Sequence, residues 1–559
     1  MGIRYIDVSD DGIRIEFPYD PHLVDIVKSS VEGRKFDPKC KVWTAPLTYT
    51  NANFILKMAE NYGFVLSDKD RIEGYIQRYS ELVEESNSIA EPVFNVEGLN
   101  LPLRPYQRTG VKYMLDNKKC IVGDEMGIGK TVEAIAAIYT SNLLPSLVVC
   151  PATIKLNWQH EIEKWTSELE PCVINSVSDI GREDLMYITN YESLDKYLKP
   201  LMEVGLKSLI FDEAHWLKTP SSKRTKLSLH LSNFCQYVWL LTGTPVLNRP
   251  SELIPLLQIV KKLDQFGGWF GFVKRYCAAY QKDVWMKVKN EETGMAVPVR
   301  KKIWDTSGSS NLRELNEKLR GYGGYIRRSK DQVLTELPPK QIAHVYVDIT
   351  NPEEYDDVDG DETIPAMLKV GKLYVEVGRG KIQPAIEWIK EFLDSEEKLV
   401  VFTYHKEMSA ALIKAFPDAA HIVQEDSQDE RYLQSEKFQD PNCQLIICSI
   451  KVAGLGLNNL KAASNILMTE LWWTFGELRQ CEDRCHRDGQ TKPVTVYYLL
   501  GDNTIDKYIM DKVDQKREIM KESSESLLCD ENFQEEIVEI YKQRGKKRKS
   551  KKQQQEELF

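Results

Sequence analysis

The chain has 559 residues and a formal net charge of −10, with 42% hydrophobic and 28% charged residues. This length predicts several domains, and the composition is typical of globular proteins rather than of disordered or fibrous ones. No apolar run approaches the ~18–20 residues of a membrane-spanning helix, and no signal peptide is recognisable. Eleven cysteines without CxxC pairs argue against a zinc finger or a disulfide framework and indicate a reducing compartment.

Residues 1–90 are expected to form a small α+β domain. Residues 13–17 alternate between apolar and polar like a half-buried strand, and residues 24–31 have helical spacing. Arg34, Lys35 and Lys41 are interleaved with Phe36 and Trp43, a mixture that suits contact with nucleic-acid phosphates and bases. We predict that the three cations contact DNA and that the two rings belong to the domain core.

Buried strands alternate with helices between residues 100 and 250, and the pattern restarts near residue 397. The predicted strands are 120–122, 147–150, 186–189, 209–211 and 238–241, then 398–403, 421–423, 444–449, 465–469 and 494–499. They predict two α/β lobes, 95–345 and 346–520, each built on a parallel sheet. Residues 250–345 are expected to be helical with a hairpin near 291–294, residues 351–365 a mobile acidic linker, and residues 521–559 a charged tail.

A glycine-rich loop follows the first of these strands. It reads Gly-Asp-Glu-Met-Gly-Ile-Gly-Lys-Thr from Gly123 to Thr131. Backbone N–H groups of such a loop bind phosphates, the lysine reaches the β- and γ-phosphates, and the threonine hydroxyl ligates Mg²⁺. Asp124 stands where the strict pattern has glycine, so the loop alone is a weak signal. The candidate ATP-binding residues here are Asp124, Glu125, Met126, Gly127, Ile128, Gly129, Lys130 and Thr131.

An acidic pair, Asp212-Glu213, follows another predicted strand. The carboxyl ends of parallel strands meet at one edge of a sheet, so this pair is expected beside the glycine-rich loop. Asp212 would hold Mg²⁺ together with Thr131, and Glu213 would orient or deprotonate the attacking water. The two motifs together predict ATP hydrolysis.

Other polar residues lie at expected sheet edges. Arg104 and Gln107 precede the glycine-rich loop, and the amide of Gln107 can bind the adenine edge with both a donor and an acceptor. Thr153 and Thr189 lie at or just after the ends of two predicted strands, where a nucleic-acid phosphate can dock. Each residue alone is also compatible with an ordinary turn.

Arg484 and Arg487 of the second lobe are predicted to lie on one helical face, because they are three residues apart. Arginines inserted at a γ-phosphate neutralise the charge that develops there and increase the rate by ~10³–10⁵. Gly456, in the run 452–458, is a further candidate for ATP contact. Phosphates held by one lobe and arginines supplied by the other would couple hydrolysis to closure of the two lobes.

The end of the chain carries eight Lys or Arg residues and no acids between residues 542 and 552. A run of this kind is either a solvated tail or an arm that contacts DNA phosphates. The DNA candidates within it are Lys546, Lys547, Arg548 and Lys549. The last five residues, Gln555 to Phe559, resemble the peptide that docks in a bacterial-type sliding clamp, with a frayed tail as the alternative.

From about residue 100 to 520 the chain resembles a superfamily 2 helicase-like ATPase of the Swi/Snf family. The matching segments are 124–131, 212–215, 241–245, 327–330, 337–340 and the Arg484/Arg487 region. The resemblance implies two tandem RecA-like lobes with helical insertions, the use of ATP and Mg²⁺, and translocation on double-stranded DNA. It also implies that residues 505–512 form a brace helix onto lobe one. Leu455, residues 473–475 and Asp488 depart from the family pattern.

Residues 19–43 are similar to the HARP-like module of annealing helicases, which is associated with fork-junction DNA. The resulting expectation is a monomeric ATP-dependent translocase on double-stranded or forked DNA, with no membrane association. Two alternatives stay open: a translocase that displaces bound protein, and a nucleotide-gated DNA clamp without turnover. A cytoplasmic, nucleoid-associated location in a bacterium or virus is favoured over a nucleus.

Overall fold

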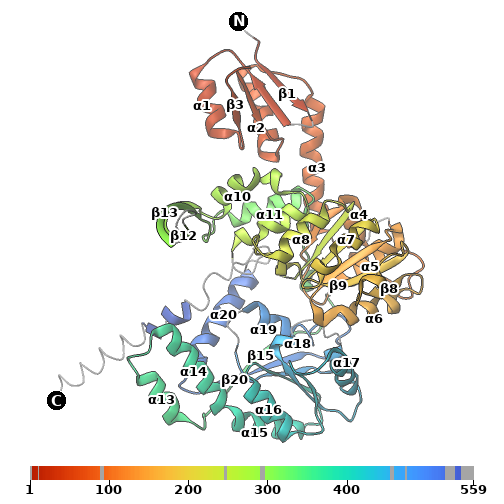
Figure 1. The fold of residues 1–559 in the computed structure, drawn as a ribbon, viewed down its shortest axis with the longest axis vertical. Helices are drawn as coiled ribbons and strands as arrows, with labels where there is room; N and C mark the ends of the chain where they lie inside the picture. The colour runs from red at the N-terminus through yellow and green to blue at the C-terminus, as the bar shows by residue number, and fades with distance from the viewer. Residues whose placement is uncertain are drawn as a thin grey trace, which may run out of the picture.

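The computed structural model describes residues 3–9, 12–88, 94–243, 249–289, 296–453, 459–471, 475–522, 536–539 and 541–542. Three parts follow one another along the long axis of the molecule (Figure 1). An N-terminal domain comes first, a lobe with a large parallel sheet (lobe one) lies in the middle, and a second such lobe (lobe two) lies at the other end. No helix of the described ranges is both long and apolar enough to cross a membrane.

The N-terminal domain is a five-stranded sheet covered by helices. Its strands are β1 (Tyr5–Ser9), β2 (Gly12–Glu16), β3 (Lys35–Asp37), β4 (Val42–Ala45) and β5 (Val65–Leu66), in the order β3-β4-β2-β1-β5, and its helices are α1 (Pro21–Ser30), α2 (Tyr49–Tyr62) and α3 (Lys69–Asn87). Ile13 and Ile15 of β2 point into the core, as the alternation predicts. Phe36 does not belong to this core. Its side chain is 48% exposed, because β3 is a short edge strand, and its ring lies 4.9 Å from that of half-buried Trp43.

Helix α3 joins the N-terminal domain to lobe one. Tyr79 of α3 stacks on Tyr49 with ring centroids 3.9 Å apart, and it is part of the core of lobe one. Lys318 of lobe one lies 3.1 Å from Glu32 of the N-terminal domain. The domain is therefore docked on lobe one through an aromatic contact and an ion pair.

The sheet of lobe one is entirely parallel, in the order β14-β6-β11-β10-β7-β9-β8. Its strands are β6 (Lys119–Val122), β7 (Ser146–Cys150), β8 (Glu170–Val173), β9 (Leu185–Asn190), β10 (Ser208–Asp212), β11 (Tyr237–Leu241) and β14 (Tyr325–Ile326), with helices α4 (Pro105–Asn117), α5 (Lys130–Ser141), α6 (Lys155–Trp165), α7 (Leu194–Glu203) and α8 (Lys223–Ser232). The five predicted strands are confirmed. The two strands that the sequence pattern missed, β8 and β14, are short edge strands, and β8 contains a proline.

An insertion separates β11 from β14. It consists of α9 (Leu253–Ile259), α10 (Gly268–Tyr276), the antiparallel strands β12 (Tyr280–Lys289) and β13 (Ala296–Asp305), and α11 (Leu312–Gly321). The turn expected near residues 291–294 lies outside the described residues, but β12 and β13 flank it as a hairpin requires.

Lobe two contains a second parallel sheet, in the order β15-β20-β19-β16-β18-β17. Its strands are β15 (Lys340–Val347), β16 (Leu399–Thr403), β17 (Ala420–Ile422), β18 (Leu445–Ser449), β19 (Asn465–Met468) and β20 (Val494–Gly501), with helices α14 (Ala366–Gly380), α15 (Ile382–Leu393), α16 (Lys406–Ala415), α17 (Gln428–Lys437) and α19 (Phe475–Glu482). The five strands predicted here are confirmed. β15 pairs with β20 along its whole length, so this sheet begins at residue 340 rather than after 345.

Two expectations about lobe two are wrong. Residues 352–360 form helix α13 (Pro352–Gly360), not a mobile linker, because Tyr355 is buried in the lobe-two core and Pro352 begins the helix. Helix α20 (Asp506–Glu522) covers the segment expected to brace lobe one. Its buried residues Ile509 and Val513 instead join the core of lobe two.

Candidate nucleotide site between the two lobes

The glycine-rich loop connects β6 to α5. Gly127 and Gly129 have φ angles of 80° and 106°, which side-chain-bearing residues rarely adopt. Lys130 folds back over the loop, and its Nζ donates to the carbonyl oxygens of Asp124 at 2.7 Å and Glu125 at 3.0 Å. Burial lowers the pKa of Lys130. The ammonium is thus held over the loop in a place where an anion would stabilise its charge.

The acidic pair lies at the carboxyl end of β10. Asp212 Oδ2 accepts a hydrogen bond from Trp158 Nε1 at 2.8 Å, and Asp212 Oδ1 accepts one from the backbone N–H of Glu213 at 2.9 Å. Burial raises the pKa of Asp212 to about 6, and the adjacent charge of Glu213 adds to this shift. A cation beside Asp212 would relieve both effects.

Glu213 is held as a carboxylate. Its φ of 49° turns the chain sharply after β10, and His215 Nδ1 lies 3.2 Å from its Oε2. Burial alone would raise the pKa of Glu213, but His215, Lys130 and Arg484 together hold it below its usual value. Glu213 is therefore ionised at neutral pH, as a group that orients or deprotonates water must be.

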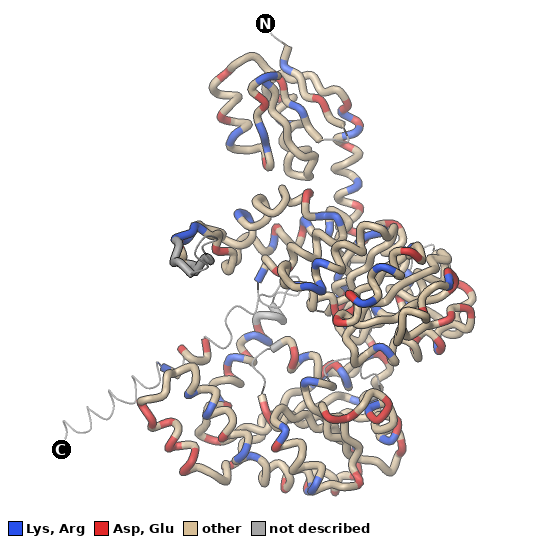
Figure 2. The backbone as a smooth tube through the Cα atoms, viewed as in Figure 1, with Lys and Arg blue, Asp and Glu red and all other residues tan. Residues whose placement is uncertain are grey.

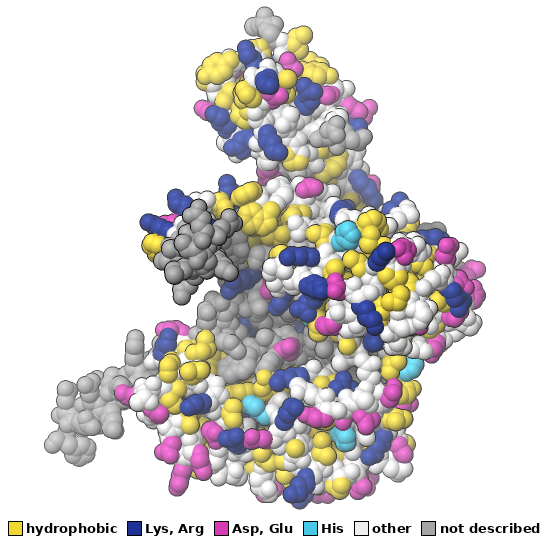
Figure 3. All heavy atoms as spheres, in the orientation of Figure 1, with side chains coloured by type: hydrophobic (Ala, Val, Ile, Leu, Met, Phe, Trp, Pro, Cys, Tyr) yellow, Lys and Arg dark blue, Asp and Glu magenta, His cyan; other side chains and the backbone are white. Residues whose placement is uncertain are grey.

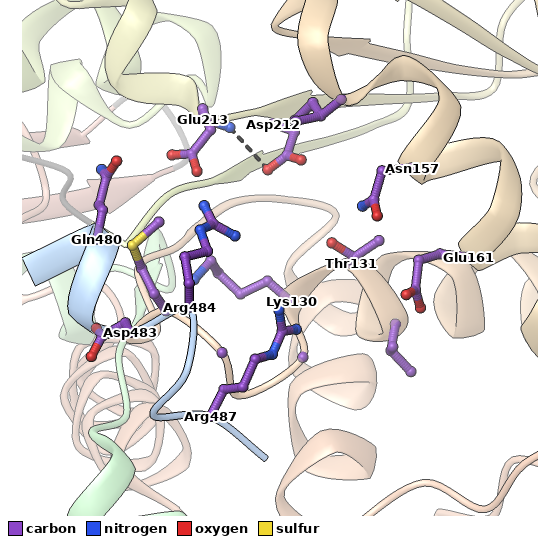
Figure 4. Close-up of a pocket in the computed structure, with 15 residues that line it drawn as sticks. Lys130, Thr131, Asn157, Glu161, Asp212, Glu213, Gln480, Asp483, Arg484 and Arg487 are labelled. Carbon is purple, nitrogen blue, oxygen red and sulfur yellow. Dashed lines mark hydrogen bonds between the residues drawn. The ribbon is translucent and has the colours of Figure 1, made fainter. Parts of the chain in front are cut away.

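Arg484 and Arg487 enter the same site from lobe two (Figure 4). α19 ends at Glu482, so the two arginines lie on the turn after the helix and not on one helical face as predicted. A Cβ atom placed on Gly127 would lie only 2.8 Å from the Cβ of Arg487. The two lobes are therefore in contact at the glycine-rich loop. Burial lowers the pKa of both arginines, that of Arg487 to about 10 with the charge of Arg484 contributing.

The resulting pocket is shared by both lobes. It is lined by Met126, Gly127, Gly129, Lys130, Thr131, Val132, Ile154, Asn157, Glu161, Asp212, Glu213, Gln480, Asp483, Arg484 and Arg487. Figure 4 shows Lys130, Arg484 and Arg487 close together, with Asp212 and Glu213 across from them. Three cations with lowered pKa values, of which Arg484 is buried and Lys130 and Arg487 are half-buried, make this pocket suited to a polyanion such as a triphosphate.

Sequence reasoning missed four polar residues of this lining. Asn157 and Glu161 are four residues apart on α6 and thus share a face toward the pocket. Gln480 and Asp483 come from α19 and the turn after it. The signal available in the sequence was the four-residue spacing of Asn157 and Glu161, shortly after the end of a predicted strand.

The oxygen ligands of the pocket fit Mg²⁺. Thr131 offers a hydroxyl and Asp212 a carboxylate, and both line the same space. Mg²⁺ prefers such hard oxygen donors and keeps several waters. These two residues are therefore the ones that would hold the ion.

Asp124 and Glu125 lie beneath the loop rather than in the pocket. Asp124 is fully buried, accepts from Arg328 Nε at 2.9 Å and from the backbone N–H of Arg328 at 2.8 Å. Arg328 also binds Glu133 at 2.7 Å. Ile128 is buried against Tyr106 as well. These side chains fix the shape of the loop, Asp124 and Glu125 through bonds to protein groups and Ile128 through packing, and the contact of the loop backbone with ATP stays a prediction.

A charge network joins the two lobes next to the pocket. Glu125 forms an ion pair with Arg479 of α19 and accepts a hydrogen bond from the backbone N–H of Lys330 at 2.8 Å. Lys330, which follows the lobe-one sheet, pairs with Asp483 of lobe two at 2.8 Å. The loop that holds the nucleotide candidates is thus tied directly to the segment that carries the arginines.

Arg104 and Gln107 are placed differently from the prediction. The amide of Gln107 accepts from the backbone N–H of Arg104 at 2.9 Å and donates to the carbonyl of Ile128 at 3.2 Å. Arg104 binds Asp488 of lobe two through both carboxylate oxygens, at 2.6 and 3.0 Å, and Glu336 at 2.6 Å. Both side chains are occupied by protein groups, and neither lines the pocket in this conformation.

The predicted DNA contacts are scattered. Arg34, Lys35 and Lys41 are exposed on the N-terminal domain. Thr153 is half-buried in the short helix after β7, and Thr189 is fully buried within the sheet, so its hydroxyl cannot reach DNA in this conformation. Gly456, Lys546, Lys547, Arg548, Lys549 and the segment Gln555–Phe559 lie outside the described residues.

Two parallel α/β lobes, a glycine-rich loop with an acidic pair on one, and arginines from the other define a helicase-like ATPase. The family model of the SNF2-related domain matches residues 106–356, and that of the helicase conserved C-terminal domain matches residues 384–489. The chain belongs to the Swi/Snf family of superfamily 2 helicase-like ATPases.

Several known proteins are similar to this chain. The Homo sapiens protein "DNA annealing helicase and endonuclease ZRANB3" is 32% identical over 469 residues, which cover 78% of this chain and 42% of that protein. The Caenorhabditis elegans "SWI/SNF-related matrix-associated actin-dependent regulator of chromatin subfamily A-like protein 1 homolog" is 28% identical over 560 residues, covering 94% and 76%. The chain thus spans about two fifths of the length of the first of these relatives.

Among solved structures, the "Sulfolobus solfataricus SWI2/SNF2 ATPase core in complex with dsDNA" is 26% identical. It covers 78% of this chain and 95% of that chain, with a TM-score of 0.38.

Proposed function

We propose that this chain is an ATP-dependent double-stranded DNA translocase that acts on forked or branched DNA. The single observation that carries the proposal is the pocket in which the loop and acidic pair of lobe one meet Arg484 and Arg487 of lobe two. A site completed only when two lobes meet links a chemical step to a change in their relative position.

The chemistry follows from the residues of the pocket. Lys130 and the backbone of the loop would bind the phosphates of ATP, and Glu213 would orient the attacking water. Arg484 and Arg487 would neutralise the charge that develops on the γ-phosphate. Thr131 and Asp212 would hold Mg²⁺, which when bound neutralises phosphate charge.

Coupling between the lobes follows from the charge network. The ion pairs Glu125–Arg479 and Lys330–Asp483 connect lobe one to lobe two. In lobe two, Arg479 and Asp483 lie just before Arg484 and Arg487 in the chain. Loss of the γ-phosphate would remove the anion that holds Arg484 and Arg487 in the pocket, so the lobes would separate. If each lobe grips the backbone of duplex DNA, the cycle of closing and opening moves the protein along it.

We propose that the N-terminal domain provides the preference for forked DNA. Arg34, Lys35 and Lys41 are exposed there, beside the exposed ring of Phe36. The similar protein ZRANB3 is named an annealing helicase, which supports a role in rewinding strands. Phosphate-binding cations next to an exposed ring suit DNA in which some bases are unpaired.

The remaining partners are also proposals. We propose that the basic run at residues 542–552 adds phosphate contacts and that Gln555–Phe559 binds a sliding clamp. The motor is proposed to act as a monomer. The expected bacterial or viral origin and cytoplasmic location stay predictions, and the relatives cited above come from animals.

The proposal is tested by measuring ATP hydrolysis without DNA and with single-stranded, blunt duplex and forked DNA, followed by a fork-rewinding assay. We expect duplex and forked DNA to stimulate ATP hydrolysis. We also expect fork rewinding to require ATP. Hydrolysis stimulated by single strands alone would contradict a duplex translocase. DNA binding gated by nucleotide without any turnover would instead favour the clamp.

A further inference from the structure

The hairpin of β12 and β13 projects sideways from lobe one, beside α10 (Figure 1). Its register pairs Trp285 with Arg300, Asp283 with Lys302 and Gln281 with Trp304. Directly paired residues of antiparallel strands lie on the same face. One face of the hairpin therefore carries Trp285, Trp304, Arg300 and Lys302, together with Gln281 and Asp283.

This face continues onto α10. The ring of Phe270 lies 6.1 Å from that of Trp304 in an edge-to-face arrangement, and the ring of Trp269 lies 4.9 Å from that of Phe270. Lys274 Nζ lies 5.8 Å from the centre of the Trp304 ring. We call the four rings of Trp269, Phe270, Trp304 and Trp285 the aromatic strip.

Three of the four rings in the strip are exposed, and Trp304 is half-buried. Trp285 is 73% exposed, Phe270 58% and Trp269 37%. Figure 3 shows hydrophobic and basic side chains together where the hairpin leaves the body of lobe one. Exposed aromatic side chains gathered on one projecting surface are typical of an interaction site.

The charge around the strip identifies the class of that ligand. β12 and β13 together contain six Lys or Arg and two Asp, whereas the whole chain has a net charge of −10. Lys282 pairs with Asp305 at 2.6 Å and Arg300 with Asp283 at 2.5 Å. Lys302, on the same face as Trp285 and Trp304, is exposed and has no ion pair among the described residues, whereas Lys301 pairs with Val284 and lies on the opposite face. Figure 2 shows Lys and Arg positions on the described part of the hairpin.

We propose that the aromatic strip binds an unpaired strand of DNA, with its bases stacked on the rings and its phosphates on the neighbouring cations. Aromatic rings stack on exposed base faces, and cations along the same groove bind the backbone. The bases of a duplex are already stacked on one another, so an intact duplex offers the rings no partner. This inference rests on the proposed function only in placing that strand at a fork.

The test measures equilibrium binding of the full chain without nucleotide, by fluorescence anisotropy of labelled oligothymidine and of a blunt duplex. We expect Trp285→Ala to weaken oligothymidine binding by about 5- to 150-fold, the range for one lost base–aromatic stack, and to leave duplex binding unchanged. Trp285→Phe should retain most of the affinity. Phe234→Ala is the matched control, because Phe234 is 57% exposed but lies outside the strip.

A second variant tests the cation separately. Lys302→Ser should reduce the slope of log K against log salt for oligothymidine by up to ~0.7, the contribution of one neutralised phosphate of a single strand, and Lys301→Ser on the opposite face is its matched control. Native oligothymidine binding by both Trp285→Ala and Lys302→Ser would overturn the proposal and leave the strip to a protein partner. Equal weakening of duplex binding by Trp285→Ala would also overturn it.

These outcomes are independent of the proposed motor function. Duplex-stimulated hydrolysis that persists in Trp285→Ala, together with lost oligothymidine binding, supports the strip. Absent hydrolysis in the native chain with intact oligothymidine binding would contradict the translocase and leave the strip in place.

Discussion

Arg104 of lobe one and Asp488 of lobe two form a two-pronged ion pair, with N–O distances of 2.6 and 3.0 Å. Arg104 caps α4 just ahead of the glycine-rich loop, and Asp488 directly follows Arg487. The pair therefore connects the element that supports the nucleotide loop to the turn that supplies the arginines.

We expect Asp488→Ala to favour separated lobes and thus to slow DNA-stimulated hydrolysis at subsaturating ATP. The two side chains are 36% and 35% exposed, so the pair contributes no more than about 1 kcal/mol, or about fivefold in rate. The charge swap Arg104→Asp/Asp488→Arg should recover part of the loss. A rate in Asp488→Ala equal to the native rate at all ATP concentrations would show that the pair does not influence closure.

Glu213→Gln should abolish turnover while ATP and DNA still bind. The amide keeps the shape of the side chain but cannot act as a base, a change worth ~10²–10⁴ in rate. Steady-state hydrolysis and ATP affinity are measured side by side. Near-native DNA-stimulated hydrolysis in this variant would remove Glu213 from the proposed role.

Arg487→Ala should reduce the turnover number by at least ~10³, with a small change in ATP affinity, because the arginine acts mainly on charge that develops during the reaction. Arg487→Lys is the matched control, since it keeps a charge without the planar fork. Arg487 touches the glycine-rich loop in this structure, so the folded state of both variants is checked by thermal unfolding. A large loss of ATP affinity with an unchanged turnover number would assign Arg487 to binding.

The buried carboxyl of Glu133 predicts a pH dependence of stability. Burial raises its pKa to about 8, well above the value near 4.3 expected in an unfolded chain. Its contribution to stability is complete below the unfolded value and is lost as the pH rises through the folded value. Glu133→Gln mimics the neutral form at every pH. The free energy of unfolding of this variant should equal the native value near pH 5 and exceed it near pH 8.

Asp124→Asn is the contrasting change at the same cluster. Asp124 is the charge partner of fully buried Arg328, and removing it leaves a buried cation undercompensated, at a cost of about 3–5 kcal/mol. Denaturant unfolding of the two variants in parallel separates the roles of the two carboxyls. Equal destabilisation by Glu133→Gln and Asp124→Asn at pH 8 would contradict this division.

The N-terminal domain can be removed in two ways with different expected results. Deletion of residues 1–67 leaves α3 and its contact through Tyr79 intact, so we expect duplex-stimulated hydrolysis to persist and the preference for forked DNA to be lost. Deletion of residues 1–90 also removes Tyr79 and Leu82, and it should lower the thermal unfolding temperature of the remaining chain. Native fork rewinding after the shorter deletion would assign the domain a structural role.

Local patterns in the sequence predicted the buried strands, the glycine-rich loop, the acidic pair and the two arginines. A fully buried parallel strand is a short continuous apolar run, and a phosphate loop needs glycines at fixed spacing, so both are visible within a few residues of chain. The same locality explains the errors. In the sequence, α13 resembles an acidic linker because acidic residues dominate its composition. Its one aromatic residue, Tyr355, is buried in the core of lobe two.

Only the tertiary structure determines which polar side chains are bound to other groups of the same chain and which are left to face the pocket. Asp124 and Arg328 are 204 positions apart in the chain, and Arg104 and Asp488 are 384 apart, so no local pattern relates them. Thr189 ends a strand in the sequence, but the neighbouring strands bury its hydroxyl. The identity of a residue fixes the bonds that it can make, and the packing of distant segments determines which of those bonds form.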